Sequence, residues 1–277
     1  MYLQKEKMDT DKKNRVLAAL NINDHHADML SAVKRETGAK IFGCTCPVIP
    51  PEIPAVFNIL LLKIPDSVPG SQPLKEKYSS VYDAVVVPDC SGICSENPFP
   101  ALESFRFSFP EGWGEDASVA IHNSFEKMLS VLCAINIKHI DIEELKKRTS
   151  VYETLRRTVR GICAAKNEKP GLISSTEISS VFETALILPP DEALKLLLPV
   201  LEWMRSEKSA EVAGIHAMLY GGRVFPSALA DRIESLGINV AEDDSCSGRR
   251  CFDLSTNAES DYLFYELLDA YSYRPLT

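Results

Sequence analysis

Apolar residues follow two patterns that alternate along this chain. Short apolar runs, typical of strands, occur in "AKIFGC", "YDAVVVPDC", "AGIHAMLYGG" and "INVAEDD". The unbroken Ala-Val-Val-Val of the second run is typical of a strand buried on both faces of a parallel sheet. Long helical patterns fill the region from Ala117 to about Arg205, and "FPSALADRIESLG" indicates a helix between the last two strands. This alternation predicts an α/β fold.

The same patterns divide the chain into four segments. Strands and helices alternate near both ends, as they do in Rossmann-like or flavodoxin-like units with parallel sheets. Between these units the pattern is helical. We therefore expect an N-terminal helical segment at 1–36, a first α/β unit at 37–116, a helical segment at 117–205 and a second α/β unit at 206–277.

Two polar residues mark the expected starts of central helices. Asp141 and Ser174 each precede a helical pattern, and Glu144 and Glu177 follow them three residues later. This spacing is typical of a capping box, in which the two side chains satisfy backbone N–H groups that the first turn leaves open.

Length and composition exclude several classes of protein. A chain of 277 residues, 45% of them hydrophobic, can bury one large core or two smaller ones. A net charge of −9, without a dense basic stripe, argues against a nucleic-acid surface. No apolar stretch reaches the roughly 18 residues of a membrane-spanning helix, and the charged start does not resemble a signal peptide. We expect a cytoplasmic protein, outside the membrane, whose partners are small molecules or other proteins.

The eight cysteines need an explanation other than disulfides, because the cytosol keeps thiols reduced. Cys133 and Cys163 lie in apolar helical runs, where a free cysteine packs as a small hydrophobic side chain. The other six form three loop pairs: Cys44 and Cys46, Cys90 and Cys94, Cys246 and Cys251. For these pairs, metal binding and plain burial both stay open.

Two of the predicted buried strands end in cysteine-bearing loops. Cys46 closely follows the first strand, and Cys90 directly follows the second. In open α/β sheets, ligands bind beyond the carboxyl ends of the strands, so two neighbouring strands would bring Cys46 and Cys90 to one crevice. With Cys44 and Cys94 nearby, four thiolates could bind a metal, for example a tetrahedral zinc ion.

The last predicted βαβ unit carries two further candidates. Gly221 and Gly222 lie at the strand-to-helix turn, where backbone N–H groups could hold an anion such as a phosphate. A plain tight turn is the other interpretation. Arg249, with Arg250 beside it, either pairs with Asp243 and Asp244 or reaches an anionic ligand.

Five stretches resemble, in the same order, subunits of the 2-hydroxyacyl-CoA dehydratase and benzoyl-CoA reductase family. "GCTCPVIPPEI" is similar to the family element G-x-x-C-x-x-x-P-x-E, which aligns Cys46, Pro50 and Glu52. "YDAVVVPDCSG" resembles the second cysteine strand. "FRFSFPEGWGEDA", "IDIEELKKRTSVYETLRR" and "GINVAEDDSCSGRRCFD" continue the likeness, the last through an acidic D-D-x-C-x-G-x-R signature. The resemblance covers about residues 35 to 275.

The resemblance implies a set of site residues. Family members hold a [4Fe-4S] cluster by three cysteines of one subunit and leave one iron open, and Cys46 and Cys90 match the first two ligands. The third family ligand lies in a further α/β unit beyond the region of "YSYRPLT", where this sequence ends. Cys94 is the first substitute and Cys44 the second. From the residues themselves, Glu52 could serve as proton donor or base if it is buried beside the cluster, or could simply hydrogen-bond the loop. Gly221, Gly222 and Arg249 are the candidates to contact the acyl-CoA.

The resemblance also implies an activity. The chain would be the iron–sulfur subunit of a 2-hydroxyacyl-CoA dehydratase, a lyase, or of a related acyl-CoA reductase. Its partners would be a second dehydratase-like subunit, in a heterodimer or homodimer, and an ATP-hydrolysing iron–sulfur activator protein that supplies one low-potential electron. That electron would make a ketyl radical of the CoA thioester. A shortened non-catalytic partner subunit and a zinc-thiolate protein remain as alternatives.

Overall fold

The computed structural model describes residues 13–21, 25–47, 49–67, 71–89, 96–108, 115–134, 140–208, 215–221, 227–245 and 247–272. The chain forms two compact units, which are treated separately. The four-stranded unit consists of His25–Glu153 and Leu254–Thr277, and the two-stranded unit of Met1–Asp24 and Thr154–Asp253. The division falls within helix α6 (Ile142–Glu168), inside the segment 117–205 that was expected to be purely helical.

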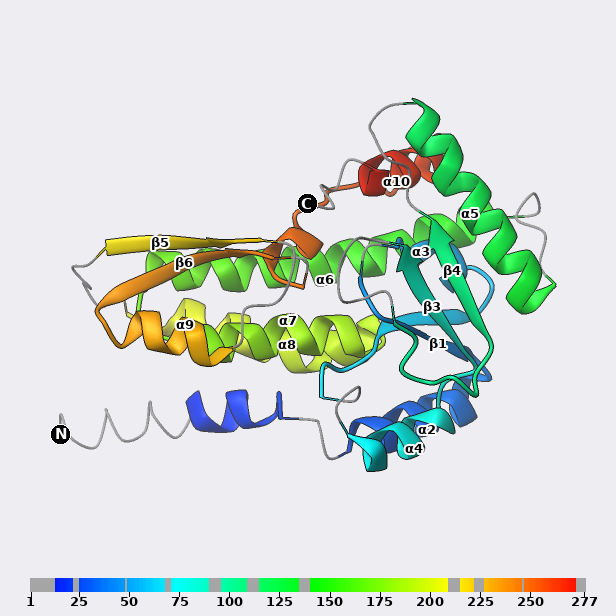
Figure 1. The fold of residues 1–277 in the computed structure, drawn as a ribbon. Coiled ribbons are helices and arrows are strands. Elements are labelled where there is room, and N and C mark those ends of the chain that lie inside the picture. The colour runs from blue at the N-terminus through cyan, green and yellow to red at the C-terminus, as the bar shows by residue number, and fades with distance from the viewer. Residues whose placement is uncertain are drawn as a thin grey trace. The chain divides into compact units, whose positions relative to one another are not determined.

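The four-stranded unit contains a fully parallel sheet with the order β2-β1-β3-β4 (Figure 1). Its strands are β1 (Lys40–Cys44), β2 (Ile59–Lys63), β3 (Ala84–Asp89) and β4 (Ser104–Ser108). The prediction that the two cysteine-bearing strands are parallel neighbours is confirmed, because Cys44 of β1 lies opposite Val86 of β3. The strand order reverses between β1 and β3, which makes the crevice at their carboxyl ends a topological switch point.

Helices cover both faces of this sheet. Because successive strand residues point to opposite faces, Phe42 and Cys44 pack on one side and Ile41 on the other. The side with Phe42 carries apolar residues of α3 (Glu52–Ala55), α5 (Glu115–Cys133) and α10 (Leu263–Ser272). The side with Ile41 carries those of α2 (His26–Thr37) and α4 (Gln72–Ser79). The unit is a three-layer α/β/α structure.

The two-stranded unit contains the predicted βαβ motif. Its strands β5 (Ile215–Tyr220) and β6 (Ile238–Asp244) pair in parallel through helix α9 (Ser227–Glu234). This unit also contains the second part of α6, α7 (Ser175–Ile187), α8 (Pro190–Ser206), the 3-10 helix η3 (Arg249–Phe252) and a short helix at 13–18. Both α/β regions therefore contain parallel sheets, and the predicted fold class is confirmed.

The starts of two helices agree with the capping residues in the sequence. Asp141 Oδ1 accepts hydrogen bonds from the backbone N–H groups of Glu143 and Glu144. Ser174 and Glu177 form a reciprocal capping box at the start of α7. In the part of the chain that the structure describes, no helix combines the length and apolar character needed to cross a membrane.

Candidate functional site

The end of β1 is fixed on both sides by its neighbours. The backbone N–H of Ile64, just after β2, donates to the Cys44 carbonyl at 2.8 Å, and the Thr45 N–H donates to Val86 of β3 at 3.3 Å. The chain leaves the sheet at Cys46, which is only 3% exposed. Its side chain belongs to the apolar cluster that also contains Phe42 and Ile49.

The two cysteines of this loop have different roles. The thiol of Cys44 donates a hydrogen bond to the backbone carbonyl of Cys46, so its proton is directed into the loop itself. To bind a metal, Cys44 would have to break this hydrogen bond and lose its proton. Of the two, Cys46 is the better candidate for a metal ligand.

Glu52 lies in the first turn of the short helix α3. Its side chain is fully buried, beside Ile53 and in the layer that contains Cys46. Pro51 precedes it as the N-cap residue, and the Pro51 carbonyl accepts the N–H of Ala55 at 3.2 Å. Burial of a carboxyl group among apolar residues costs free energy, so Glu52 is a candidate for a functional group rather than a surface one.

The side chains at the carboxyl ends of β1 and β3 decide whether this site suits an iron–sulfur cluster. Cys46 places a buried thiol near the switch point, and cysteine sulfur is the ligand type that such clusters use. Within the described residues, no three His, Cys, Asp or Glu side chains are grouped to hold a metal ion. Cys90 and Cys94 lie outside the described residues, although Cys90 directly follows Asp89, the last residue of β3. Cys46 is therefore the best candidate for a cluster ligand among the described residues, and a complete ligand set needs residues outside them.

Two arginines of η3 bind acidic residues at the end of β6. Arg250 reaches both carboxylate oxygens of Asp244, at 3.0 and 2.7 Å, and also the Asp244 carbonyl. Arg249 contacts Glu242 and, at 3.1 Å, Asp253. The expected pairing of Arg250 is observed, whereas Arg249 pairs with acids other than Asp243.

A close approach to Asp243 explains why position 248, in the loop after β6, is a glycine. A Cβ atom there would overlap the backbone oxygen of Asp243 and approach its carboxyl carbon to 2.8 Å. Asp243 in turn accepts the N–H of Ser245 at 3.0 Å. The D-D-x-C-x-G-x-R pattern therefore specifies a tight, self-bonded turn. Its cysteine, Cys246, lies outside the described residues.

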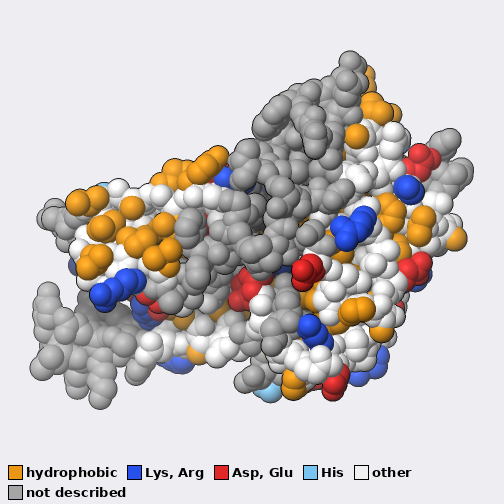
Figure 2. Space-filling model, viewed as in Figure 1, with side chains coloured by type: hydrophobic (Ala, Val, Ile, Leu, Met, Phe, Trp, Pro, Cys, Tyr) orange, Lys and Arg blue, Asp and Glu red, His pale blue; other side chains and the backbone are white. Residues whose placement is uncertain are grey.

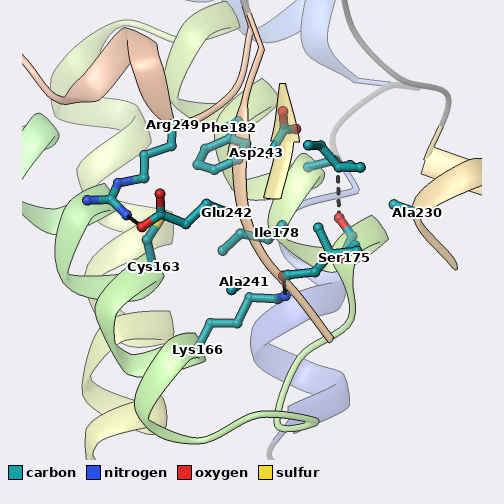
Figure 3. A pocket seen from close by; sticks show the side chains of 13 residues that line it. Cys163, Lys166, Ser175, Ile178, Phe182, Ala230, Ala241, Glu242, Asp243 and Arg249 are labelled. Atoms are coloured by element: carbon teal, nitrogen blue, oxygen red, sulfur yellow. Dashed lines mark hydrogen bonds and ion pairs between the residues drawn. The ribbon is translucent and has the colours of Figure 1, made fainter. Parts of the chain in front are cut away.

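A small pocket opens beside β6 in the two-stranded unit (Figure 3). Arg249, Glu242 and Cys163 lie at one side of it, and Ser175 lies at the other. About 20 Å³ is open to the centre of a water molecule, so water-sized groups fit but a whole coenzyme does not. The other lining residues are Lys166, Ile178, Ser179, Phe182, Leu219, Ala230, Val240, Ala241 and Asp243.

A buried lysine forms the polar floor of this pocket. Lys166 Nζ donates to the Val240 carbonyl and lies 3.4 Å from Glu234. Glu234 also accepts the N–H and the hydroxyl of Ser175 at 2.9 and 2.7 Å. Burial raises the pKa of the nearby Cys163 thiol to about 12. No short sequence motif marks this network, because its members come from three helices and one strand that are separated in the chain.

Comparison with known proteins identifies the family. The family model for the 2-hydroxyglutaryl-CoA dehydratase D-component matches residues 96–276. The chain belongs to this family. No curated protein matches the sequence.

The region that matches the family model contains some of the candidate residues and not others. The matched region includes Gly221, Gly222 and Arg249 but begins after Cys46, Glu52, Cys90 and Cys94. Gly221 directly follows β5 as expected and is not among the residues lining the pocket, while Gly222 lies outside the described residues. The resemblance in the sequence is confirmed at the level of a 2-hydroxyacyl-CoA dehydratase-like subunit.

Proposed function

We propose that this chain is the iron–sulfur subunit of a 2-hydroxyacyl-CoA dehydratase-like enzyme, with a [4Fe-4S] cluster at the carboxyl ends of β1 and β3. The observation that carries the proposal is the reversal of strand order between these two parallel strands. Ligands in open α/β sheets bind at such a point. Family membership supports the reaction class.

Cys46 and Cys90 are the first two ligands in this proposal, and Cys94 is the third. Cys94 is four residues from Cys90, so both thiolates can face one cluster. Cys44 is a poorer third ligand, because its thiol donates to the Cys46 carbonyl. A second subunit that supplies the third ligand is the alternative.

The chain's own residues create the setting for the reaction. The apolar cluster around Cys46 excludes water from the inner side of the edge, which strengthens electrostatic interactions there. Glu52, buried in the same layer, donates a proton to the departing hydroxyl group or accepts a proton from the substrate. A cluster held by Cys46 and Cys90 would supply the one-electron chemistry that permits loss of an unactivated hydroxyl from the thioester.

The substrate in this proposal is a 2-hydroxyacyl-CoA, and the reaction is that of a lyase. Gly221 and Gly222, with the helix that follows, bind a phosphate of the coenzyme, and Arg249 adds positive charge. Because Arg249 already contacts Glu242 and Asp253, a phosphate must compete with these carboxylates. A second dehydratase-like subunit and an ATP-dependent iron–sulfur activator complete the system.

Anaerobic purification followed by iron and acid-labile sulfide analysis tests the proposal. The wild-type chain should be brown and contain iron and sulfide in equal amounts. Cys46→Ser and Cys90→Ser should each lose most of the iron, because each removes a ligand at the switch point. Cys133→Ser is the matched control, since Cys133 lies in an apolar run of α5, and it should keep its iron.

Two results would contradict the proposal in different ways. A colourless protein that contains zinc, lost on substitution of Cys46 or Cys90, would favour a zinc-thiolate site. A protein without metal would favour a non-catalytic partner subunit.

A further inference from the structure

A lysine lies buried at the carboxyl end of an otherwise apolar strand. Strand β2 reads Ile-Leu-Leu-Leu-Lys, and its last residue, Lys63, is only 4% exposed. Lysine is almost never fully buried unless it is paired, because removing an ammonium group from water costs free energy. An apolar side chain of similar volume would fill the same position without this cost. Packing alone therefore does not explain a lysine here.

The strand register places Lys63 on the same face of the sheet as the cysteine loop. Ile59 and Leu61 of β2 pack in the apolar cluster that also contains Cys44 of β1. Side chains two residues apart along a strand point to the same face, so Lys63 follows Ile59 and Leu61 on this face. The pairing of the two strands sets Lys63 opposite Cys44. The lysine and the loop after β1 are therefore neighbours at the carboxyl edge of the sheet.

The same layer contains two residues of the candidate site. Cys46 belongs to this apolar cluster, and Glu52 is fully buried in α3, which packs against β2. Lys63 Nζ lies 2.7 Å from Asp66 Oδ1, but the side chain of Asp66 is 54% exposed and that of Lys63 only 3%. Water screens the carboxylate of this pair more than the ammonium, so the pair leaves a positive potential on its buried side.

Burial distinguishes Lys63 from cationic side chains at the surface. Figure 2 shows Lys and Arg side chains as separate spots over one face of the molecule, where they contact solvent. Salt screens such exposed charges beyond about 8 to 10 Å, whereas a buried charge is screened much less. Lys63 can therefore act on a group bound at this edge that surface lysines hardly affect.

We propose that the buried ammonium of Lys63 raises the reduction potential of the cluster. This inference rests on the proposed function. One-electron reduction adds one negative charge at the edge, and a positive charge nearby favours the reduced form. The electron comes from the ATP-dependent activator of the proposed system, and no atom is transferred in this step. Lys63 thus makes the site easier to reduce.

A redox titration of the anaerobically purified chain, followed by electron paramagnetic resonance, tests the proposal. Lys63→Met should make one-electron reduction about tenfold less favourable, a shift of about 59 mV to a more negative potential. Lys63→Arg keeps the charge and should stay close to wild type. Lys77→Met is the matched control, because Lys77 also pairs with an aspartate but is 37% exposed on α4, on the other face of the sheet. It should leave the potential unchanged.

Asp66→Asn provides a second test with the opposite sign. It removes the carboxylate but keeps the ammonium, so the potential should become less negative. Because Asp66 is exposed, this variant decides alone if Lys63→Met loses its iron. Potentials that do not differ among the wild type, Lys63→Met and Asp66→Asn, or an equal shift in Lys77→Met, would overturn the inference and leave the proposed function intact. A wild-type chain without iron would overturn the proposed function and this inference with it.

Discussion

At the scale of single residues, the packing of a glycine explains why the D-D-x-C-x-G-x-R pattern of this chain forms a tight turn. The turn after β6 closes because Gly248 lies directly against the Asp243 backbone, where no side chain fits. The arginine of the same motif, Arg250, donates hydrogen bonds to both carboxylate oxygens of Asp244. The motif therefore requires these residue types for folding, whatever further role the loop has in binding.

We expect Gly248→Ala to destabilise the chain by about 1 to 3 kcal/mol, because the new methyl group forces the Asp243 backbone to move. Gly237→Ala is the control. Gly237 has a φ of 80° and open space around it, so its substitution adds only the backbone strain, about 1 kcal/mol. Urea unfolding measures both. Equal losses for the two variants would show that the contact with Asp243 does not matter.

A second prediction at this scale concerns Cys163 and the fall in the free energy of unfolding at alkaline pH. Burial raises the pKa of its thiol from 9.0 to about 12. Below pH 9 the thiol is protonated in both states and its contribution is complete. Above pH 9 the unfolded chain loses the proton first, so the free energy of unfolding falls by about 1.4 kcal/mol per pH unit until the folded thiol also ionises.

The variant Cys163→Ala isolates this effect. The difference in stability between wild type and variant should shrink as the pH rises from 9 to 10, and chemical denaturation at several pH values measures it. Burial also raises the pKa of Tyr82, which both proteins share, so its contribution cancels in the comparison. A difference that does not change with pH would mean that the thiol ionises normally in the folded chain.

At the scale of elements, the start of α7 is fixed by a capping box and by a distant acid. Ser174 and Glu177 bond reciprocally, while Glu234 of α9 accepts from Ser175. Ser174→Ala should lower the free energy of unfolding by about 1 kcal/mol, because it leaves the N–H of Glu177 without its local acceptor.

Ser180→Ala is the control for this substitution. Ser180 lies in the same helix and donates only to the Thr176 carbonyl one turn earlier, so its loss should change stability by less than about 0.5 kcal/mol. Thermal or urea unfolding of the two variants makes the comparison. Similar values would contradict a stabilising role for the capping box.

Elements with a strong local signal were predictable from the sequence. The unbroken Ala-Val-Val-Val of β3 and the serine–glutamate spacing at α7 depend on neighbours within a few residues. The pairing of Lys166 with Glu234 was not predictable, because the two residues are 68 positions apart and meet only through tertiary packing. For the same reason the sequence could not show that Arg249 contacts Glu242 and Asp253.

At the scale of the whole molecule, the candidate cluster site was predictable only in part. The prediction that β1 and β3, which both run into cysteine-bearing loops, are neighbours is confirmed. The rule for open α/β sheets then places a ligand crevice at their carboxyl ends. The sequence could not show which of Cys44 and Cys46 is the better candidate for a cluster ligand. That ranking follows from the hydrogen bond between the Cys44 thiol and the Cys46 carbonyl, which depends on the folded loop.

The central claim is that this chain itself holds a [4Fe-4S] cluster at the β1–β3 edge. Low-temperature electron paramagnetic resonance of the anaerobically purified, chemically reduced chain tests it most directly. We predict the signal of a reduced [4Fe-4S] cluster in the wild type and in Cys133→Ser, and its loss in Cys46→Ser and Cys90→Ser. A wild-type chain without this signal, or a signal that survives both ligand substitutions, would contradict the claim.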